Sequence, residues 1–317
     1  MKAPVRKFAV TAAASVALLA ALGAAAPASA RVDREVRIRY AAARVVVIVE
    51  NRTDIAVEIE PGSGGLPLPT VTRSGDEVRI NGNLGRRAFR RCESGPANAR
   101  QPGEGASVDV RDHGRVNLSA APLIVVRTPP TVDISTEDSA VFGSIGRGAT
   151  SIELGSGGCG DWTVANTAGS ADLSIGGSGS IRAGTSGSLE AGIGGSGRIT
   201  AGATGDLDAS IGGSGTIIVA SATGQVDAAI GGSGDIRVNG GRPSSVDAAI
   251  GGSGDIIITG DAGALDASIA GSGNVTVTGT VASVDASLVG GGDVRVGRVT
   301  GAVSQTVMGG GRVRIGD

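Results

Sequence analysis

The sequence predicts an all-β fold, a parallel β-helix with coils of about 18–20 residues, and three observations predict it. A glycine-rich phrase recurs at a nearly constant step, the segments between its copies alternate apolar and polar residues, and glycines recur at the same places in every copy. A fixed period near 20 is typical of a solenoid, in which each repeat forms one coil. We expect the right-handed form because the coil length drifts, although a left-handed helix would also accept 18-residue coils.

The repeated phrase is Ile-Gly-Gly-Ser-Gly, which begins at Ile175, Ile193, Ile211, Ile230 and Ile250. Looser copies begin at Ile269, Leu288 and Val307, and successive steps are 18, 18, 19, 20, 19, 19 and 19 residues. Stacked coils lie about 4.8 Å apart, so equivalent residues lie over one another. These eight residues are therefore predicted to form one interior column. A second, narrower interior column is predicted from Ala191, Ala209, Ala228, Ala248, Ala267 and Ala286.

Each repeat is predicted to contain two short strands. Residues 226–230 alternate apolar and polar side chains, which indicates a strand with one buried face, and residues 236–238 form a second strand after the glycine corner. The corner glycines are expected to adopt positive φ and to let coils approach closely. The alternative is a flexible Gly/Ser linker, but such linkers do not keep Ile, Ala and Val in register over eight copies.

Residues 1–30 are predicted to be a secretory signal peptide. Lys2, Arg6 and Lys7 precede an apolar run, and Ala28-Ser29-Ala30 is a small-residue cleavage site. A retained membrane anchor is the alternative. No later stretch is apolar enough to span a bilayer, so we expect no transmembrane segment in the mature chain. The protein is predicted to be exported to the periplasm or cell surface of a bacterium.

The mature chain is predicted to have two parts. Residues 31–130 lack the strict repeat, and we expect irregular β-rich coils with a cap, or alternatively a small β-sandwich. Residues 131–317 form the regular helix and carry 9 Arg against 18 acidic residues, whereas residues 31–130 carry 16 Arg against 12. An acidic body with one Trp, one Tyr and three Phe argues against nucleic acid as a partner.

Two cysteines, Cys92 and Cys159, occur in the sequence. Two cysteines in an exported chain most simply pair, which would join the N-terminal region to the first regular coils. The closed loop would stabilise the fold by about 4 kcal/mol in the chain-entropy model. Two free thiols are the alternative.

An acidic residue lies three positions before each corner residue. The column comprises Asp172, Glu190, Asp208, Asp227, Asp247, Asp266 and Asp285. Alternation points these side chains outward, where neighbouring carboxylates repel by about 0.8 kcal/mol each in water. A solvated face or hydrogen bonds to turns would explain the column, and so would binding of cations or of a cationic partner.

Other motifs suggest no catalysis or cofactor. Gly231 to Ile236 resembles a calcium-binding nonapeptide, but its Asp is one place early, and no metal or cofactor is predicted. His113 lacks a Ser or Cys partner and is expected in a loop. The corner serines are expected to use their hydroxyls for hydrogen bonds within turns. Arg86, Arg87, Arg90 and Arg91 form the basic cluster, which is expected to be a solvated loop or a contact for anionic envelope polymer or lipid.

The reiterated Gly-Ser-Gly-Asp-Ile phrase behind a signal peptide resembles the head GIN domain of auto-transporter adhesins, over about residues 125–317. The stretch from Val132 through Phe142 to Trp162 is similar to the family's exported proteobacterial members. The resemblance implies an adhesin-type role and supplies no catalytic residues. An autotransporter also needs a C-terminal membrane β-barrel, and the chain stops at Gly316-Asp317, straight after a repeat strand.

Three functions are compatible with these features. We expect a non-enzymatic envelope solenoid that acts as an adhesin or scaffold and binds an unidentified protein or polysaccharide. A carbohydrate-active β-helix enzyme is the second hypothesis, although such sites cluster carboxylates with sugar-stacking aromatics. The third is a periplasmic sensor or assembly partner that self-associates through the edge of the last coil, Arg312 to Ile315.

Overall fold

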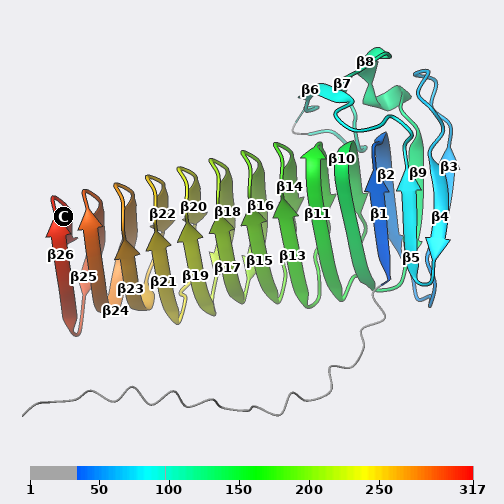
Figure 1. Cartoon of the computed structure of the whole chain (residues 1–317). Coiled ribbons are helices and arrows are strands. Elements are labelled where there is room, and N and C mark those ends of the chain that lie inside the picture. The colour runs from blue at the N-terminus through cyan, green and yellow to red at the C-terminus, as the bar shows by residue number, and fades with distance from the viewer. Residues whose placement is uncertain (1–33, 97, 317) are drawn as a thin grey trace, which may run out of the picture. The chain divides into compact units, whose positions relative to one another are not determined.

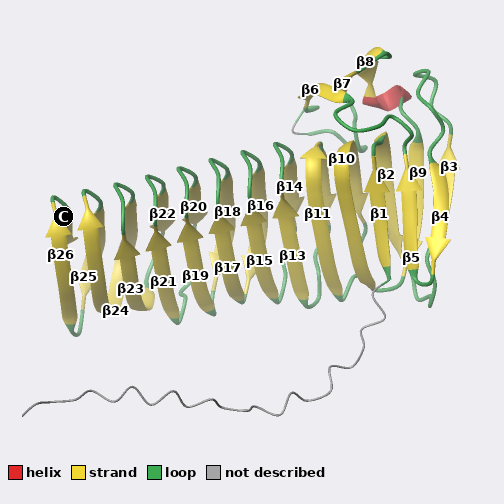
Figure 2. Cartoon of the chain, viewed as in Figure 1, coloured by secondary structure: helices red, strands yellow, loops and turns green. Residues whose placement is uncertain are grey.

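The computed structural model describes residues 34–96 and 98–316, and the predicted signal peptide lies outside them. The described residues belong to one compact unit. They form strands almost throughout, with one short 3-10 helix, η1 (Leu118–Ala120), in the described part of the chain. Figure 1 shows the strands side by side along a stack of coils, and Figure 2 shows how little helix there is. The predicted all-β parallel helix is confirmed, and its handedness stays a prediction.

Each regular coil contributes one strand to each of two parallel ladders. In pairing order, the first ladder contains β5 (Glu77–Asn81), β1 (Glu35–Arg39), the first half of β10 (Thr131–Ile145), β11 (Ser151–Cys159), β13 (Ser170–Ile175), β15 (Ser188–Ile193), β17 (Asp206–Ile211), β19 (Gln225–Ile230), β21 (Ser245–Ile250), β23 (Ala262–Ile269), the second half of β24 (Asn274–Gly290) and β26 (Val303–Gly309).

The second ladder runs through the other strand of each coil. In pairing order, it contains β9 (Leu123–Thr128), β2 (Ala42–Val49), the second half of β10, β12 (Asp161–Val164), β14 (Ser180–Ala183), β16 (Arg198–Thr204), β18 (Thr216–Ala222), β20 (Asp235–Val238), β22 (Asp255–Ile258), the first half of β24, β25 (Asp293–Val299) and β27 (Arg312–Ile315).

The interior columns form as the repeat predicts. Ile175 pairs with Ile193, and the column continues residue on residue to Leu288 and Val307. Its members as far as Leu288 are buried, as are the column alanines from Ala191 onward. Trp162 takes the place that Ile181 holds in the next coil and is fully buried. Like side chains therefore stack into one continuous core.

The glycines of the regular corners are required for close approach and not for positive φ, which occurs at Gly290 and Gly309 in the last two, looser copies. A Cβ added at Gly213 would lie 2.1 Å from the carbonyl oxygen of Gly195 in the preceding coil, whereas one at Gly212 would meet nothing within 4 Å. Neither glycine has positive φ, so the expectation of positive φ at the regular corners is wrong. Ala270 occupies the place of Gly212 in a looser copy, in agreement with the open space there.

The coil that comes first in the sequence is not at the end of the stack. β1 pairs with β5 on one side and with β10 on the other, and β2 lies in the same way between β9 and β10. β3 (Ala56–Glu60) and β4 (Thr70–Ser74) pair antiparallel with β9 and β5 at this end. From Arg34 the described chain therefore forms a coil inside the stack, then builds the outer coil, and then passes to the other side of its first coil.

An insertion between β5 and β9 packs on the coils of β2 and β10. It contains a three-stranded antiparallel sheet of β6 (Phe89–Glu93), β7 (Ser107–Val110) and β8 (Gly114–Asn117), followed by η1. A second core cluster forms where Val108 and Leu118 of the insertion meet Ala42 and Phe142 of the coils. Apolar burial thus fixes the insertion at one end of the regular stack (Figure 1).

The last coil has one uncovered side among the described residues. β26 pairs only with β24, and β27 only with β25. Val307 is 40% exposed although its column neighbour Leu288 is 1% exposed. Self-association through this edge stays a prediction.

The two corner glycines give a matched test of the close approach. Gly213→Ala is expected to destabilise the protein by about 1–3 kcal/mol or more, because its Cβ would overlap a backbone oxygen of the adjacent coil. Gly212→Ala is expected to change stability by less than about 0.5 kcal/mol. Denaturant unfolding of both variants checks this, and equal stability losses would contradict it.

Candidate functional site

The predicted acidic column forms a ladder in register on the first sheet. Asp172 pairs with Glu190, and the pairing continues one residue per coil through Asp208, Asp227, Asp247 and Asp266 to Asp285. Every neighbouring pair comes from directly hydrogen-bonded strands. The carboxylates therefore follow the strand spacing of about 4.8 Å, and we call this column the acidic ladder.

The acidic ladder is longer than the sequence indicates. Asp172 also pairs with Glu153, Glu153 with Asp133, and Asp133 with Glu35. Read from the sequence alone, the repeat before Ile175 predicts Leu154 at the corner position opposite Ile175, and this alignment misses Glu153. In the structure Leu154 pairs with Leu173, and Ser156 pairs with Ile175. The sequence Ile152-Glu153-Leu154 alternates apolar and acidic residues in the same way as Ala171-Asp172-Leu173, and this could have given the correct register. Ile152 and Leu154 are both buried, as that alternation requires.

Arginines neutralise only the N-terminal end of the acidic ladder. Arg37 contacts Glu35 at 2.7 Å and Glu77 of the neighbouring strand at 3.5 Å, and Arg79 also pairs with Glu77. From Glu153 to Asp285, no ladder carboxylate forms an ion pair within the described chain. From Glu153 to Asp285 the acidic ladder is thus a row of negative charge without a paired cation among the described residues.

Burial and like-charge repulsion raise the pKa of two members of the acidic ladder. Partial burial, together with the neighbouring charges of Glu190 and Glu153, raises the pKa of Asp172 to about 6. Burial and the charges of Asp266 and Asp227 also raise the pKa of Asp247. Desolvation and like charges both disfavour the ionised form, so these two positions hold protons more strongly than a free Asp.

A second polar column, on the other sheet, is structural. Asp255 accepts a hydrogen bond from the backbone N–H of Asn274 at 3.1 Å, and Asp293 accepts one from Arg312 at 3.0 Å. Asp235 is also held by Arg237 at 2.9 Å. These carboxylates accept hydrogen bonds from backbone N–H groups of the next coil. This role explains the Asp of the Gly-Ser-Gly-Asp phrase without a bound metal.

The corner serines behave differently from the prediction. In regular corners their backbone N–H groups bond the preceding coil, as Ser196 does to the oxygen of Gly177 at 3.0 Å. Their hydroxyls are exposed and make no hydrogen bond with other described residues. The predicted hydroxyl bonds within turns are therefore wrong, and the serines bridge successive coils through their backbone N–H groups.

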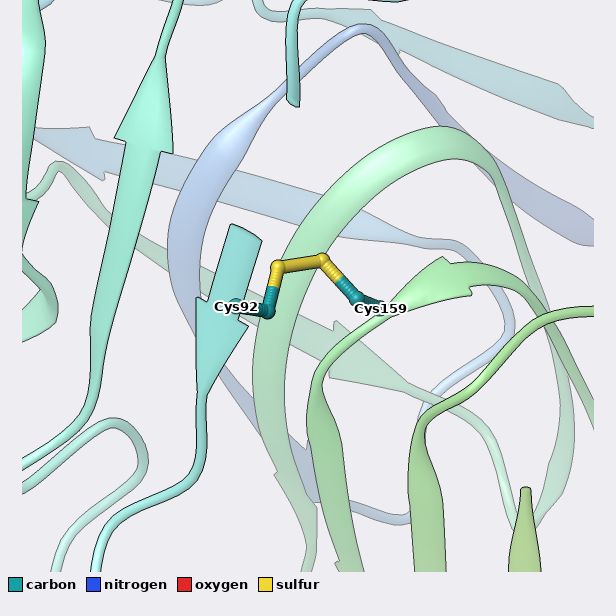
Figure 3. Close-up of a disulfide and its surroundings, with 2 residues drawn as sticks. All are labelled: Cys92 and Cys159. Atoms are coloured by element: carbon teal, nitrogen blue, oxygen red, sulfur yellow. A yellow bond between two sulfur atoms is a disulfide. The ribbon is translucent and has the colours of Figure 1, made fainter. Parts of the chain in front are cut away.

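A disulfide joins Cys92 of β6 to Cys159 at the end of β11 (Figure 3). The Cα atoms lie 6.2 Å apart, and the two residues are 67 positions apart in sequence. The predicted pairing is confirmed. The bond ties the insertion to the glycine-rich end of β11, directly before Gly160 and β12.

A cavity of about 570 Å³ lies beside this disulfide. Its walls include Arg87, Arg90 and Arg91 from the insertion, and its other side is formed by the corner glycines and serines of successive coils. The sequence indicates the basic cluster but gives no sign of this opposing wall, because the two surfaces are distant in sequence. His113 is exposed in the turn between β7 and β8, as expected, and lies outside this cavity.

The comparison with family models matches residues 108–243 to the family described as "Putative auto-transporter adhesin, head GIN domain". Residues 108–243 are therefore similar to a head GIN domain. The match runs from β7 in the insertion to just beyond β20, so it covers the corner wall of the cavity and part of the acidic ladder, whereas Arg87, Arg90 and Arg91 precede it. The resemblance suggested by the repeat is confirmed, and the proteobacterial origin stays a prediction.

No curated protein matches the chain. The crystal structure of a "Putative lipid binding protein" from Parabacteroides distasonis ATCC 8503 is 15% identical, covers 90% of this chain and 92% of its own, and has a TM-score of 0.48. Among the described residues, no helix has the length and apolar character needed to cross a bilayer. The same residues contain no group of three or more His, Cys, Asp or Glu arranged to hold a metal ion.

The raised pKa of Asp172 predicts that the acidic ladder lowers the stability of the fold to an extent that depends on pH. In the folded protein Asp172 binds its proton below about pH 6, whereas in the unfolded chain it does so only below about pH 4. Its contribution to stability is therefore greatest at low pH and falls as the pH rises through this window. Asp172→Asn is expected to be more stable than wild type at pH 7.5, with a difference that shrinks as the pH falls from 6 to 4.

Thermal melts across this pH range would measure the difference. Asp76→Asn, in the exposed turn between β4 and β5, provides a control for loss of one negative charge outside the acidic ladder. A gap between wild type and Asp172→Asn that stays constant with pH would contradict the assignment.

Proposed function

We propose that this chain is an exported, non-enzymatic binding module of the bacterial envelope that acts as an adhesin. The observation that carries the proposal is the head GIN match, which lies on a regular stack of coils. Such a stack repeats the same outward side chains at fixed spacing, which suits contact with an extended surface or polymer. The described residues offer no clustered carboxylates with aromatics of the kind that carbohydrate-active β-helices use.

Location at the cell surface is the first requirement of this proposal. Protease treatment of intact bacteria is expected to remove the protein, and cell fractionation is expected to recover it with the surface material. Protection until the outer membrane is permeabilised would contradict adhesion and favour the periplasmic sensor or assembly role. Breakdown of polysaccharide by the purified protein would overturn the non-enzymatic assignment in favour of a carbohydrate-active enzyme.

The acidic ladder supports a cationic partner for this module. Between Glu153 and Asp285 the ladder presents one uncompensated carboxylate per coil, and nearby small residues such as Ala229 and Ala249 leave the sheet accessible. A partner with regularly spaced positive charges would relieve the repulsion between coils. Electrostatic attraction of this kind chiefly accelerates association and weakens as salt is added.

Binding to immobilised polylysine tests the cationic preference. The variant Asp227→Asn/Asp247→Asn/Asp266→Asn is expected to bind at least about tenfold more weakly than wild type, because three adjacent charges are lost. The matched control Glu60→Gln/Asp76→Asn/Asp112→Asn removes the same charge outside the acidic ladder and is expected to retain binding. Equal losses in both variants would mean that net charge, and not the acidic ladder, determines the attraction.

A further inference from the structure

The cavity beside the disulfide is a second surface, independent of the proposed function. It is bounded by β6 of the insertion and by the corners that follow β11, β13 and β15. The disulfide Cys92–Cys159 and the partly buried Phe89 also line it. Because a covalent bond and the second core cluster hold the two walls together, the cavity is built into the fold.

The insertion directs three arginines to this cavity. A bulge between Phe89 and Arg91 interrupts the pairing of β6 with β7, so the adjacent residues Arg90 and Arg91 both line the cavity with Arg87. Arg87 also has a φ of 56°, in the left-handed region that non-glycine residues seldom adopt. Such backbone strain is concentrated at functional sites in proteins.

None of these three guanidinium groups has an anionic partner within the described chain. The ion pairs and side-chain hydrogen bonds of the insertion involve other arginines, such as Arg115 with Glu93 and Arg86 with Tyr40. Asp138 is the acidic residue in the cavity lining, and it makes no ion pair with a described residue. The lining therefore carries three positive charges against one negative charge.

The opposite wall offers hydrogen-bond donors from the corners. The N–H groups of Gly177 and Gly195 donate no backbone hydrogen bond within the described chain, and the hydroxyls of Ser178 and Ser196 are exposed and unbonded there. A Cβ at Gly177 would lie 1.9 Å from the oxygen of Gly158, so this position of the wall must be glycine. Backbone N–H groups and hydroxyls are common contacts for phosphate oxygens.

We propose that this cavity binds a phosphate ester that also carries hydroxyl groups, such as a sugar phosphate or a glycerophosphate unit. The guanidinium groups match phosphate oxygens in planar, two-point geometry. At about 570 Å³ the cavity has room for more than an inorganic phosphate. Asp138 would repel a second anionic group and accept a hydrogen bond from a ligand hydroxyl. The ester could be free or the headgroup of a lipid.

Titration calorimetry with four probes tests the proposal and separates the two sources. The probes are glycerol 3-phosphate, inorganic phosphate, glucuronate, and vesicles of phosphatidylcholine with and without phosphatidylglycerol. We expect glycerol 3-phosphate to bind more tightly than inorganic phosphate and glucuronate, with an affinity that falls as NaCl is added. Binding only to the phosphatidylglycerol vesicles would identify the lipid headgroup as the source.

The arginines are tested by a matched pair of variants. Arg90→Gln/Arg91→Gln is expected to weaken binding of glycerol 3-phosphate at least about tenfold, since each charge-assisted contact is substantial. Arg242→Gln/Arg298→Gln removes the same charge from exposed arginines that lie outside the cavity and is expected to bind as wild type does. Thermal melts establish that both variants are folded.

Three results would overturn the proposal. They are absence of binding by every phosphate-containing probe, glucuronate binding as tight as that of glycerol 3-phosphate, and equal losses in the two double variants. Each of these leaves the adhesin assignment untouched, because that assignment is tested by surface exposure and by variants of the acidic ladder.

Discussion

The close approach of successive coils at the glycine corners is the constraint on which this structure depends. Backbone oxygens of one coil occupy the space that a Cβ of the next would need, as at Gly213 over Gly195. This contact lets the strands on both sides of the corner hydrogen-bond to the coils before and after them. Of the two glycines that follow each corner Ile, only the second is needed for this close approach. The first is replaced by alanine, valine and methionine in later copies.

The same constraint produces the acidic ladder. Once every coil is held in register, any outward side chain that recurs once per coil must lie over its own copies. For isoleucine in the interior this stacking adds apolar burial, whereas for aspartate on the surface it adds repulsion. Partial burial, together with this repulsion, raises the pKa of Asp172, and no ion pair with a described residue relieves the repulsion there. The second polar column avoids this cost by bonding to the next coil's backbone.

The N-terminal part of the chain breaks the simple order of the repeat. Its first coil lies between an outer coil and β10, and the insertion that follows β5 folds back over the corners of the regular coils. This return brings a basic segment against a wall of glycine and serine, and the disulfide fixes it there. The cavity is therefore a product of the irregular part meeting the regular part.

The sequence by itself determined the parallel coils, the interior columns, the outward acidic ladder from Asp172 to Asp285 and the pairing of the two cysteines. These follow from local periodicity and composition, because a repeat that alternates with period two leaves few ways to bury its apolar face. Tertiary structure alone decided the place of β1 inside the stack, the register of Leu154, and the wall that faces Arg90 and Arg91. Those features depend on pairings between segments far apart in the chain, and single-chain periodicity carries no information about which distant strand or corner a segment will meet.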